Sequence, residues 1–329
     1  MSIRCRPFVF SAALVVLSVA HAYAAELPPA QSATSIAAET QLPDYRRAQW
    51  QRLSQKTDRD SLLAALLLSM PDNDSPPANR ADVERRVASA FGNDPVALFV
   101  LASGCQIQSN PCTHHEYYDA LVRIAPDNTV NWLLLPNHAA PTAAQIHFAA
   151  AATMADSQLR VTMNIVQTAL TNQSATAVDN IDAGALALAL RQKAVDRVPL
   201  PEFGATVRLC KAPPDALRDD CVQLGRKLID DRSGAILAHM VGSAMLQRLV
   251  KGTPEDKVAK ELRRNYVWLS EQLPEFVDTP MHDDIVRYGE WDAWLRAADR
   301  AHVSRTPAPT WVPKNPQSLL LSEDRTSAK

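Results

Sequence analysis

The sequence predicts an all-α protein, and three observations support this fold class. Glycine is scarce, with 9 residues in a chain of 329, whereas proline is common, with 23. This composition disfavours folds that need many tight turns or phosphate-binding loops. Apolar residues recur at helical spacing between polar breaks, and helix-capping patterns mark several of those breaks. Together these features predict short antiparallel helices that pair as hairpins.

The predicted helices follow this periodicity in chain order. They cover residues 44–56, 60–70, 79–91, 95–104, 113–125, 129–137, 142–154, 158–171, 178–197, 202–210, 214–230, 234–250, 254–272 and 281–302. Capping boxes at Thr113 and Thr142, each with Glu or Gln three residues later, support two of the starts. Asp94 followed by proline supports a third, because proline suits the first helical position. The Ala–Leu alternation over 185–190 is assigned to helix, since neither residue is β-branched.

The first 24 residues have the pattern of a secretory signal peptide. Arg4 and Arg6 precede an apolar run over residues 7–20, and an Ala-Tyr-Ala box ends at Ala24. An uncleaved anchor is the alternative, but the run is shorter than the roughly 20 residues that span a bilayer. We therefore expect cleavage near Ala24, export to the periplasm or the outside, and no transmembrane segment in the mature chain.

The remaining chain divides into three expected regions. Residues 25–42 are rich in small and polar residues and predict a flexible leader. Residues 43–303 predict a single helical body. Residues 304–329 predict a proline-rich extended tail, whose Trp311 offers an apolar contact to the body.

The cysteines predict disulfides. Removal of the signal peptide takes Cys5 and leaves Cys105, Cys112, Cys210 and Cys221, an even number in an exported chain. Three pairings are open to four cysteines. We expect the local pairs Cys105–Cys112 and Cys210–Cys221, because each would join two successive helices at a corner.

One junction resembles a known repeat family. The segment Ala-Leu-Val-Arg-Ile-Ala-Pro-Asp-Asn over residues 120–128, followed by Trp-Leu-Leu-Leu over 132–135, is similar to the boundary between tetratricopeptide (TPR) repeats. The chain departs from that pattern at Pro136, where the family has glycine, and at Ala139, where it has tyrosine. The resemblance implies a TPR-like α-solenoid that binds partners, and it implies no catalytic residues.

A second motif suggests a metal. His115-Glu116-x-x-Asp119 differs by one ligand from the H-E-x-x-H zinc signature. On a helix, His115 and Asp119 share one face, and Glu116 would act as general base. A catalytic zinc needs a third protein ligand, for which the candidates are His138, His147, His282 and Asp283.

Simpler interpretations exist for the same residues. Glu116 completes the capping box of Thr113, which already explains its position. The nearby pair Cys105 and Cys112 could join His114 and His115 in a Cys/His zinc site, but their spacing fits no common zinc motif, and export favours a disulfide.

Aromatic residues gather late in the chain. Packing inside the last helical hairpins is one interpretation, and a partner-binding surface is the other, because tryptophan and tyrosine are enriched at binding hot spots. The residues concerned are Tyr266, Trp268, Tyr288, Trp291 and Trp294.

The sequence excludes some function classes and favours others. Its 34 basic and 36 acidic residues give no electrostatic basis for nucleic-acid binding. It contains no G-x-S-x-G elbow and no G-K-[ST] phosphate loop. We expect an exported binding or scaffolding protein without a cofactor, whose partner is a protein of the cell envelope. The alternatives are a metal-dependent hydrolase built on His115, Glu116 and Asp119, and a binder of small ligands or peptidoglycan fragments.

Overall fold

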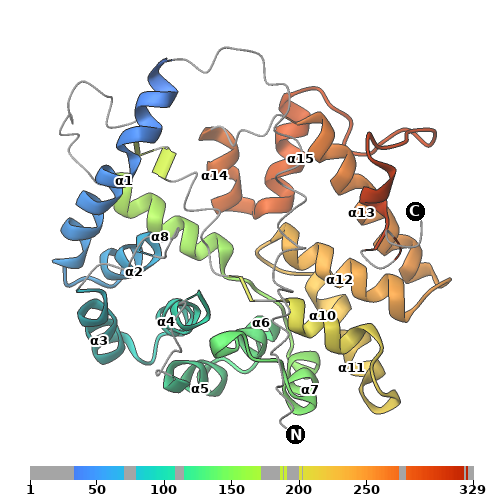
Figure 1. Cartoon of the computed structure of the whole chain (residues 1–329), viewed down its shortest axis with the longest axis horizontal. Coiled ribbons are helices and arrows are strands. Elements are labelled where there is room, and N and C mark those ends of the chain that lie inside the picture. Colours follow the sequence, from blue (N-terminus) through green and yellow to red (C-terminus); the bar gives the residue numbers. More distant parts are fainter. Residues whose placement is uncertain are drawn as a thin grey trace, which may run out of the picture.

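The computed structural model confirms the all-α fold class. It describes residues 33–69, 79–107, 115–171, 186–187, 189–190, 200–201, 203–273, 279–321 and 324 (Figure 1). Within these ranges the regular structure is helical and no strand is present; Asn128 and Met154 form an isolated β-bridge. The signal-peptide region, Thr113, Cys112 and most of the predicted helix 178–197 lie outside the described residues.

The helices have the following bounds. The first half contains α1 (Ala33–Ser54), α2 (Arg59–Leu68), α3 (Arg80–Phe91), α4 (Pro95–Ile107), α5 (His115–Ile124), α6 (Thr129–Leu133), η2 (Pro136–His138), α7 (Ala143–Ala151) and α8 (Leu159–Thr171). The second half contains α10 (Phe203–Lys211), α11 (Asp215–Ile229), α12 (Ile236–Leu249), α13 (Pro254–Gln272), α14 (Thr279–Tyr288), α15 (Glu290–Arg300) and η3 (Pro316–Leu319). None of the described helices is both long and apolar enough to cross a membrane.

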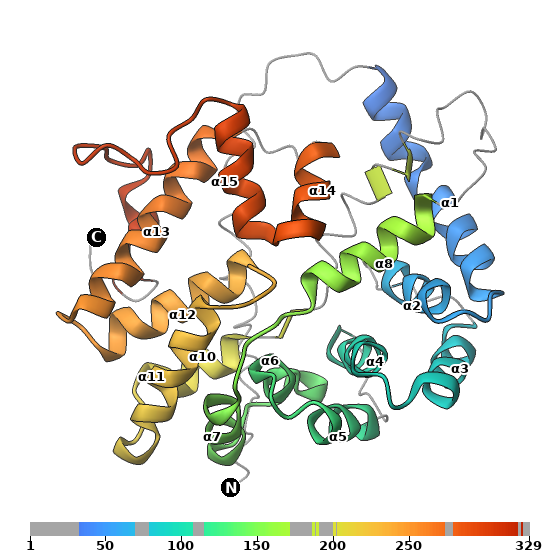
Figure 2. The same cartoon turned by 180° about the vertical axis from the view of Figure 1, so that it is seen from behind.

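Most helices pack against their neighbours in the chain, as hairpins do. Helices α1 and α2, α4 and α5, α6 and α7, α11 and α12, and α14 and α15 form such pairs. Helix α8 is different, because it contacts α2 on one side and α14 on the other, and it crosses the middle of the molecule (Figures 1 and 2). Its Ile165 and Leu170 belong to the core under α1–α4, whereas Leu159 and Met163 belong to the core under α10–α15.

The predicted caps that can be inspected are confirmed. Asp94 accepts hydrogen bonds from the backbone N–H groups of Val96 and Ala97 at 2.8 and 3.0 Å. Thr142 and Gln145 form the full capping box at the start of α7. These contacts satisfy amide groups that the first turn of a helix leaves without partners.

Two predicted helices are interrupted. The predicted helix 281–302 is two helices, because Gly289 has φ +96° and ends α14 one residue before α15 begins. The predicted helix 129–137 ends at Leu133. Leu134 leaves the helical conformation, with ψ 55°, and Pro136 lacks the N–H that a continuing helix would donate.

The start of the body also differs from the expectation. Helix α1 begins at Ala33, so residues 33–42 are helical where the sequence suggested part of a flexible leader. This stretch lacks the apolar periodicity that marks a packed helix. It is rich in alanine and contains glutamate and glutamine, and these residues have high helix propensity.

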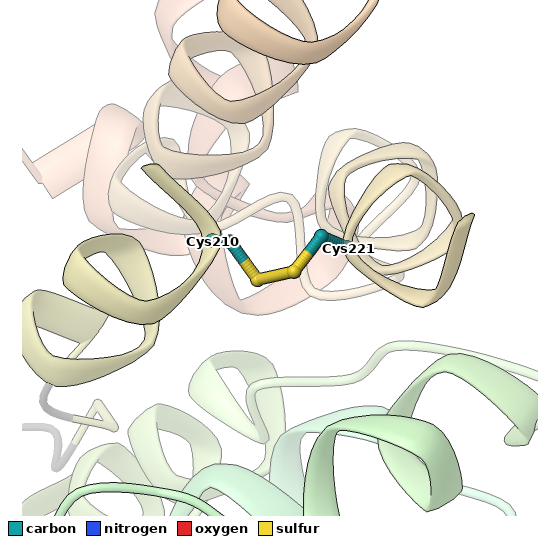
Figure 3. Close-up of a disulfide and its surroundings, with 2 residues drawn as sticks. All are labelled: Cys210 and Cys221. Carbon is teal, nitrogen blue, oxygen red and sulfur yellow. A yellow bond between two sulfur atoms is a disulfide. The ribbon is translucent and has the colours of Figure 1, made fainter. Parts of the chain in front are cut away.

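One of the two predicted disulfides is present. Cys210 of α10 and Cys221 of α11 are bonded across the corner between the two helices, with their Cα atoms 5.6 Å apart (Figure 3). Both cysteines are buried. Closing a short loop of this kind stabilises a fold by about 2–3 kcal/mol through the unfolded chain. The second pair stays a prediction, since Cys112 and the side chain of Cys105 lie outside the described residues.

Candidate functional site

The structure places His115, Glu116 and Asp119 on the first turns of α5. All three side chains are exposed to solvent. Among the described residues, no group of three or more His, Cys, Asp and Glu side chains is close enough to hold a metal ion.

The candidates for a third ligand have other surroundings. The ring of His147 lies 3.1 Å from Asp220 on α11. Asp283 accepts a hydrogen bond from Gln167 of α8 at 2.7 Å. His282 is buried on α14, and the side chain of His138 lies outside the described residues. The geometry thus assembles no metal centre around His115 in the described part of the chain.

A surface pocket of about 380 Å³ lies between α2 and α3. Its cations already have partners within the chain. Arg85 forms an ion pair with Asp82 at 3.1 Å, and Arg86 donates to the backbone carbonyl of Ser54 at 2.6 Å. Arg86 therefore donates to carbonyl groups at the end of α1 and stabilises that helix end.

The late aromatic residues contact different partners. Tyr266 of α13 packs against Trp294 of α15, with ring centroids 5.7 Å apart. Trp291 makes an edge contact with His239 of α12 at 6.2 Å. Both contacts join neighbouring helices, as core packing does.

The other two late aromatic residues have partners of their own. Tyr288 is 40% exposed at the end of α14, and the guanidinium of Arg296 lies 3.6 Å from the centroid of its ring. Trp268 of α13 contacts Trp311 of the C-terminal tail, with centroids 5.5 Å apart. The structure thus distributes the five residues over separate contacts.

A different surface, which the sequence analysis missed, lies on α7. Its outward side chains are all exposed, and only one of them can carry charge; we call them the α7 face: Ala143, Ala144, His147, Phe148 and Ala151. Phe148 is 49% exposed, and its ring stacks on Trp132 of α6 with centroids 4.9 Å apart. The opposite side of α7 is buried and packs against α6 and α11.

The local sequence explains this arrangement. Residues 143–151 read Ala-Ala-Gln-Ile-His-Phe-Ala-Ala-Ala and contain no Lys, Arg, Asp or Glu. The solvent side of a surface helix normally carries charged residues, so their absence is the signal that could have identified the face. Trp132 is held in place by the hydrogen bond from its Nε1 to the carbonyl of Pro126 at 2.8 Å.

A network of buried and half-buried polar groups, which we call the polar junction, lies where two connections meet the start of a helix. The connection from α7 to α8, the connection from α11 to α12 and the start of α15 supply its members: Asp156, Ser157, Asp231, Ser233 and Glu290. Asp231 is 5% exposed and accepts hydrogen bonds from the N–H and hydroxyl of Ser157 at 2.8 and 2.9 Å. It also accepts the N–H of Ala235 at 3.0 Å.

The other two carboxylates extend the polar junction. Asp156 accepts the hydroxyl of Ser233 and, at 2.9 Å, the N–H of Gln158. Glu290 accepts the N–H of Ile236 at 2.8 Å and so caps the start of α12. Carboxylates thereby satisfy backbone groups that would otherwise be buried without partners.

Burial raises the pKa of Asp231, and the nearby charge of Asp156 adds to this effect, while the hydrogen bonds from Ala235 and Ser157 oppose it. Shifted carboxylates can mark catalytic sites. Both oxygen atoms of Asp231 already accept hydrogen bonds from groups of the chain itself. The polar junction is therefore best explained as a structural contact that holds separate segments together.

His239 lies beside the polar junction and should make the free energy of unfolding depend on pH. It is 6% exposed, and burial lowers its pKa, opposed by a hydrogen bond with the Asp231 backbone and by the charges of Asp230 and Asp292. Below about pH 6.5 the unfolded chain gains a proton that the folded chain resists, so stability falls as the pH drops from there. The variant His239→Phe should lose less stability than the wild type between pH 7.5 and 5.5 in urea unfolding. Equal losses would contradict this assignment.

The α7 face lies on one helix, whereas the polar junction joins separate segments. One presents apolar groups to solvent, and the other buries polar groups. No protein-family model, no curated protein and no solved structure matches this chain.

Proposed function

We propose that the chain is an exported helical binding protein that holds a protein partner in the cell envelope through the α7 face. The observation that carries this proposal is the exposed Phe148, stacked on Trp132 within an outward face of alanines. Aromatic anchors surrounded by small apolar contacts are typical of binding hot spots, and a polar rim completes them. The pair of His147 and Asp220 supplies such a rim at one edge.

The architecture supports the same proposal. We propose that the helix pairs around α6 form a TPR-like array, in which binding residues lie on helix faces and not in a reactive centre. Trp132, the first residue of the TPR-like Trp-Leu-Leu-Leu segment, is the residue on which Phe148 stacks. The signal-peptide pattern over residues 1–24 supports export, and N-terminal sequencing of the mature protein tests it, with Ala25 as the expected first residue.

Site-specific photo-crosslinking tests the binding surface. A photoreactive amino acid at Ala144, on the α7 face, should give an adduct of one defined mass in the native envelope. The same amino acid at Val258, which is 59% exposed on α13, serves as the control and should not give it. Identical adducts from both positions, or none from Ala144, would argue against the α7 face.

A substitution sharpens this test. Phe148→Asp, combined with the crosslinker at Ala144, should reduce the adduct about tenfold, because a charge replaces the aromatic anchor of the face. Because Phe148 stacks on Trp132, the change should lower the free energy of unfolding by about 1 kcal/mol, which leaves the chain folded. Val258→Asp is the matched control and should leave the adduct unchanged.

A further inference from the structure

The tail after α15 returns along α13 (Figures 1 and 2). Helix η3 packs against α13, and Leu321 is buried at the end of this path. The contact surface on α13 consists of Arg264, Trp268 and Glu271, which we call the α13 cradle. The segment it holds, residues 304–314, contains three prolines and Trp311.

The α13 cradle holds this segment mainly by its backbone. The Nη2 atom of Arg264 donates to the carbonyl oxygens of Ala308 at 2.7 Å, Pro309 at 3.3 Å and Trp311 at 3.2 Å. Contacts to carbonyl groups do not depend on the side chain of the residue bound. They suit a proline-rich chain, which has few N–H groups and leaves its carbonyls open to a donor. The segment turns at this point, because the N–H of Trp311 donates to the carbonyl of Ala308 at 2.9 Å.

Further polar contacts lie at each end of the segment. The Nε1 atom of Trp268 donates to the carbonyl of Ser304 at 2.7 Å. A carboxylate oxygen of Glu271 accepts the N–H of Lys314 at 2.8 Å. The contacts of the α13 cradle thus span the segment from one end to the other.

One side chain of the segment is recognised specifically. The ring of Trp311 meets Trp268 edge-on, and the guanidinium of Arg264 lies 5.4 Å from the centroid of the Trp311 ring. Edge-on aromatic contact and a cation over an indole both select an aromatic residue at this position. Pro307 and Pro313 on either side are buried, whereas Pro309 and Val312 are exposed.

We propose that the α13 cradle is a binding surface for proline-rich segments that carry a tryptophan, and that the chain's own tail fills it in cis. Another polypeptide with such a segment takes the place of the tail. The tail itself shows the chemistry of the ligand, because the α13 cradle contacts its carbonyl groups and its indole. This surface is separate from the α7 face and goes beyond the function proposed above.

The covalent link between the tail and the body determines how well another peptide can replace the tail. A tail joined to its own binding surface acts at an effective concentration in the millimolar range, so a free peptide competes poorly against it. Substitutions that weaken the contact between the tail and the α13 cradle should therefore make the cradle accessible to a free peptide. Trp311→Ala removes the anchor, and Lys314→Pro removes the N–H that Glu271 accepts, and both leave the α13 cradle intact.

The test uses the full chain and a fluorescein-labelled peptide with the sequence of residues 304–321. By fluorescence anisotropy, the Trp311→Ala and Lys314→Pro chains should each bind the peptide at least tenfold more tightly than the wild type. Adding Trp268→Ala to either variant should weaken binding at least tenfold. Tyr288→Ala, which removes an exposed aromatic residue elsewhere, is the matched control and should change nothing.

Three outcomes would overturn the proposal. The peptide binds neither tail variant although both show the helical circular dichroism of the wild type; binding is unaffected by Trp268→Ala; or a peptide with alanine at position 311 binds equally well. None of these outcomes affects crosslinking from Ala144. The proposals for the α13 cradle and the α7 face are therefore tested independently.

Discussion

Replacing Asp231 with alanine should destabilise the protein by about 3–5 kcal/mol. The buried carboxylate accepts the N–H and hydroxyl of Ser157 and the N–H of Ala235. Without it, two backbone donors and a hydroxyl are left in a buried site with no acceptor, and each loses its hydrogen bond without regaining water. Urea unfolding followed by circular dichroism measures the loss.

The neighbouring carboxylate provides the control. Asp230 is exposed, so Asp230→Ala should change the free energy of unfolding by only about 0.5 kcal/mol. Asp231→Asn should fall between the two, because its amide oxygen still accepts one hydrogen bond while its NH₂ group faces a donor. If Asp230→Ala and Asp231→Ala lower the free energy of unfolding by similar amounts, the polar junction does not stabilise the contact between its segments.

Replacing Gly289 with alanine should destabilise the protein by about 3 kcal/mol, whereas Gly252→Ala should cost about 1 kcal/mol. Both glycines have a positive φ, +96° and +84°, so both substitutions carry backbone strain. Gly289 also has ψ 167°, a combination that only glycine adopts easily. A further difference is steric. A Cβ atom at Gly289 would lie 2.4 Å from the carbonyl oxygen of Ser233, and at Gly252 it would meet nothing within 4 Å.

The larger loss at Gly289 has a second cause. Ser233 can move away only by giving up the backbone hydrogen bond that Glu290 donates to it at 3.3 Å. The test is to compare the melting temperatures of both variants with that of the wild type. If the two variants melt at the same temperature, the close approach between Gly289 and Ser233 is not a source of stability.

The sequence was informative where structure depends on near neighbours. The caps at Asp94 and Thr142 and the bond between Cys210 and Cys221 each involve residues a short distance apart, and each was predicted. Such features follow from local hydrogen bonding and loop closure, which a single segment contains.

The break at Gly289 could not be predicted in this way. The apolar stripe continues across it from Ile285 to Ala293, so the periodicity indicates one helix. The reason for the break lies on another segment, because the backbone of Ser233 approaches Gly289 from the connection between α11 and α12. The sequence of residues 281–302 alone gives no indication of the contact between Ser233 and Gly289.

The candidate sites show the same limit. The polar junction joins Ser157 and Asp231, which are 74 residues apart, and serine and aspartate in connections have no spacing that predicts a partner. The α7 face did leave a signal, an uncharged run over residues 143–151. That run also fits a buried helix, and only the packing of α7 shows that Phe148 points outward.

Helix α8 affects how the helical body responds to destabilisation. In a linear repeat protein each unit contacts only the next, so terminal units can fray while the middle stays folded. Here α8 couples α2 to α14, and its side chains complete both large cores. We therefore expect the early and late hairpins to unfold in one cooperative transition, and their long-range contacts to make folding slower than that of a simple hairpin stack. Loosening either end should weaken the packing of the other.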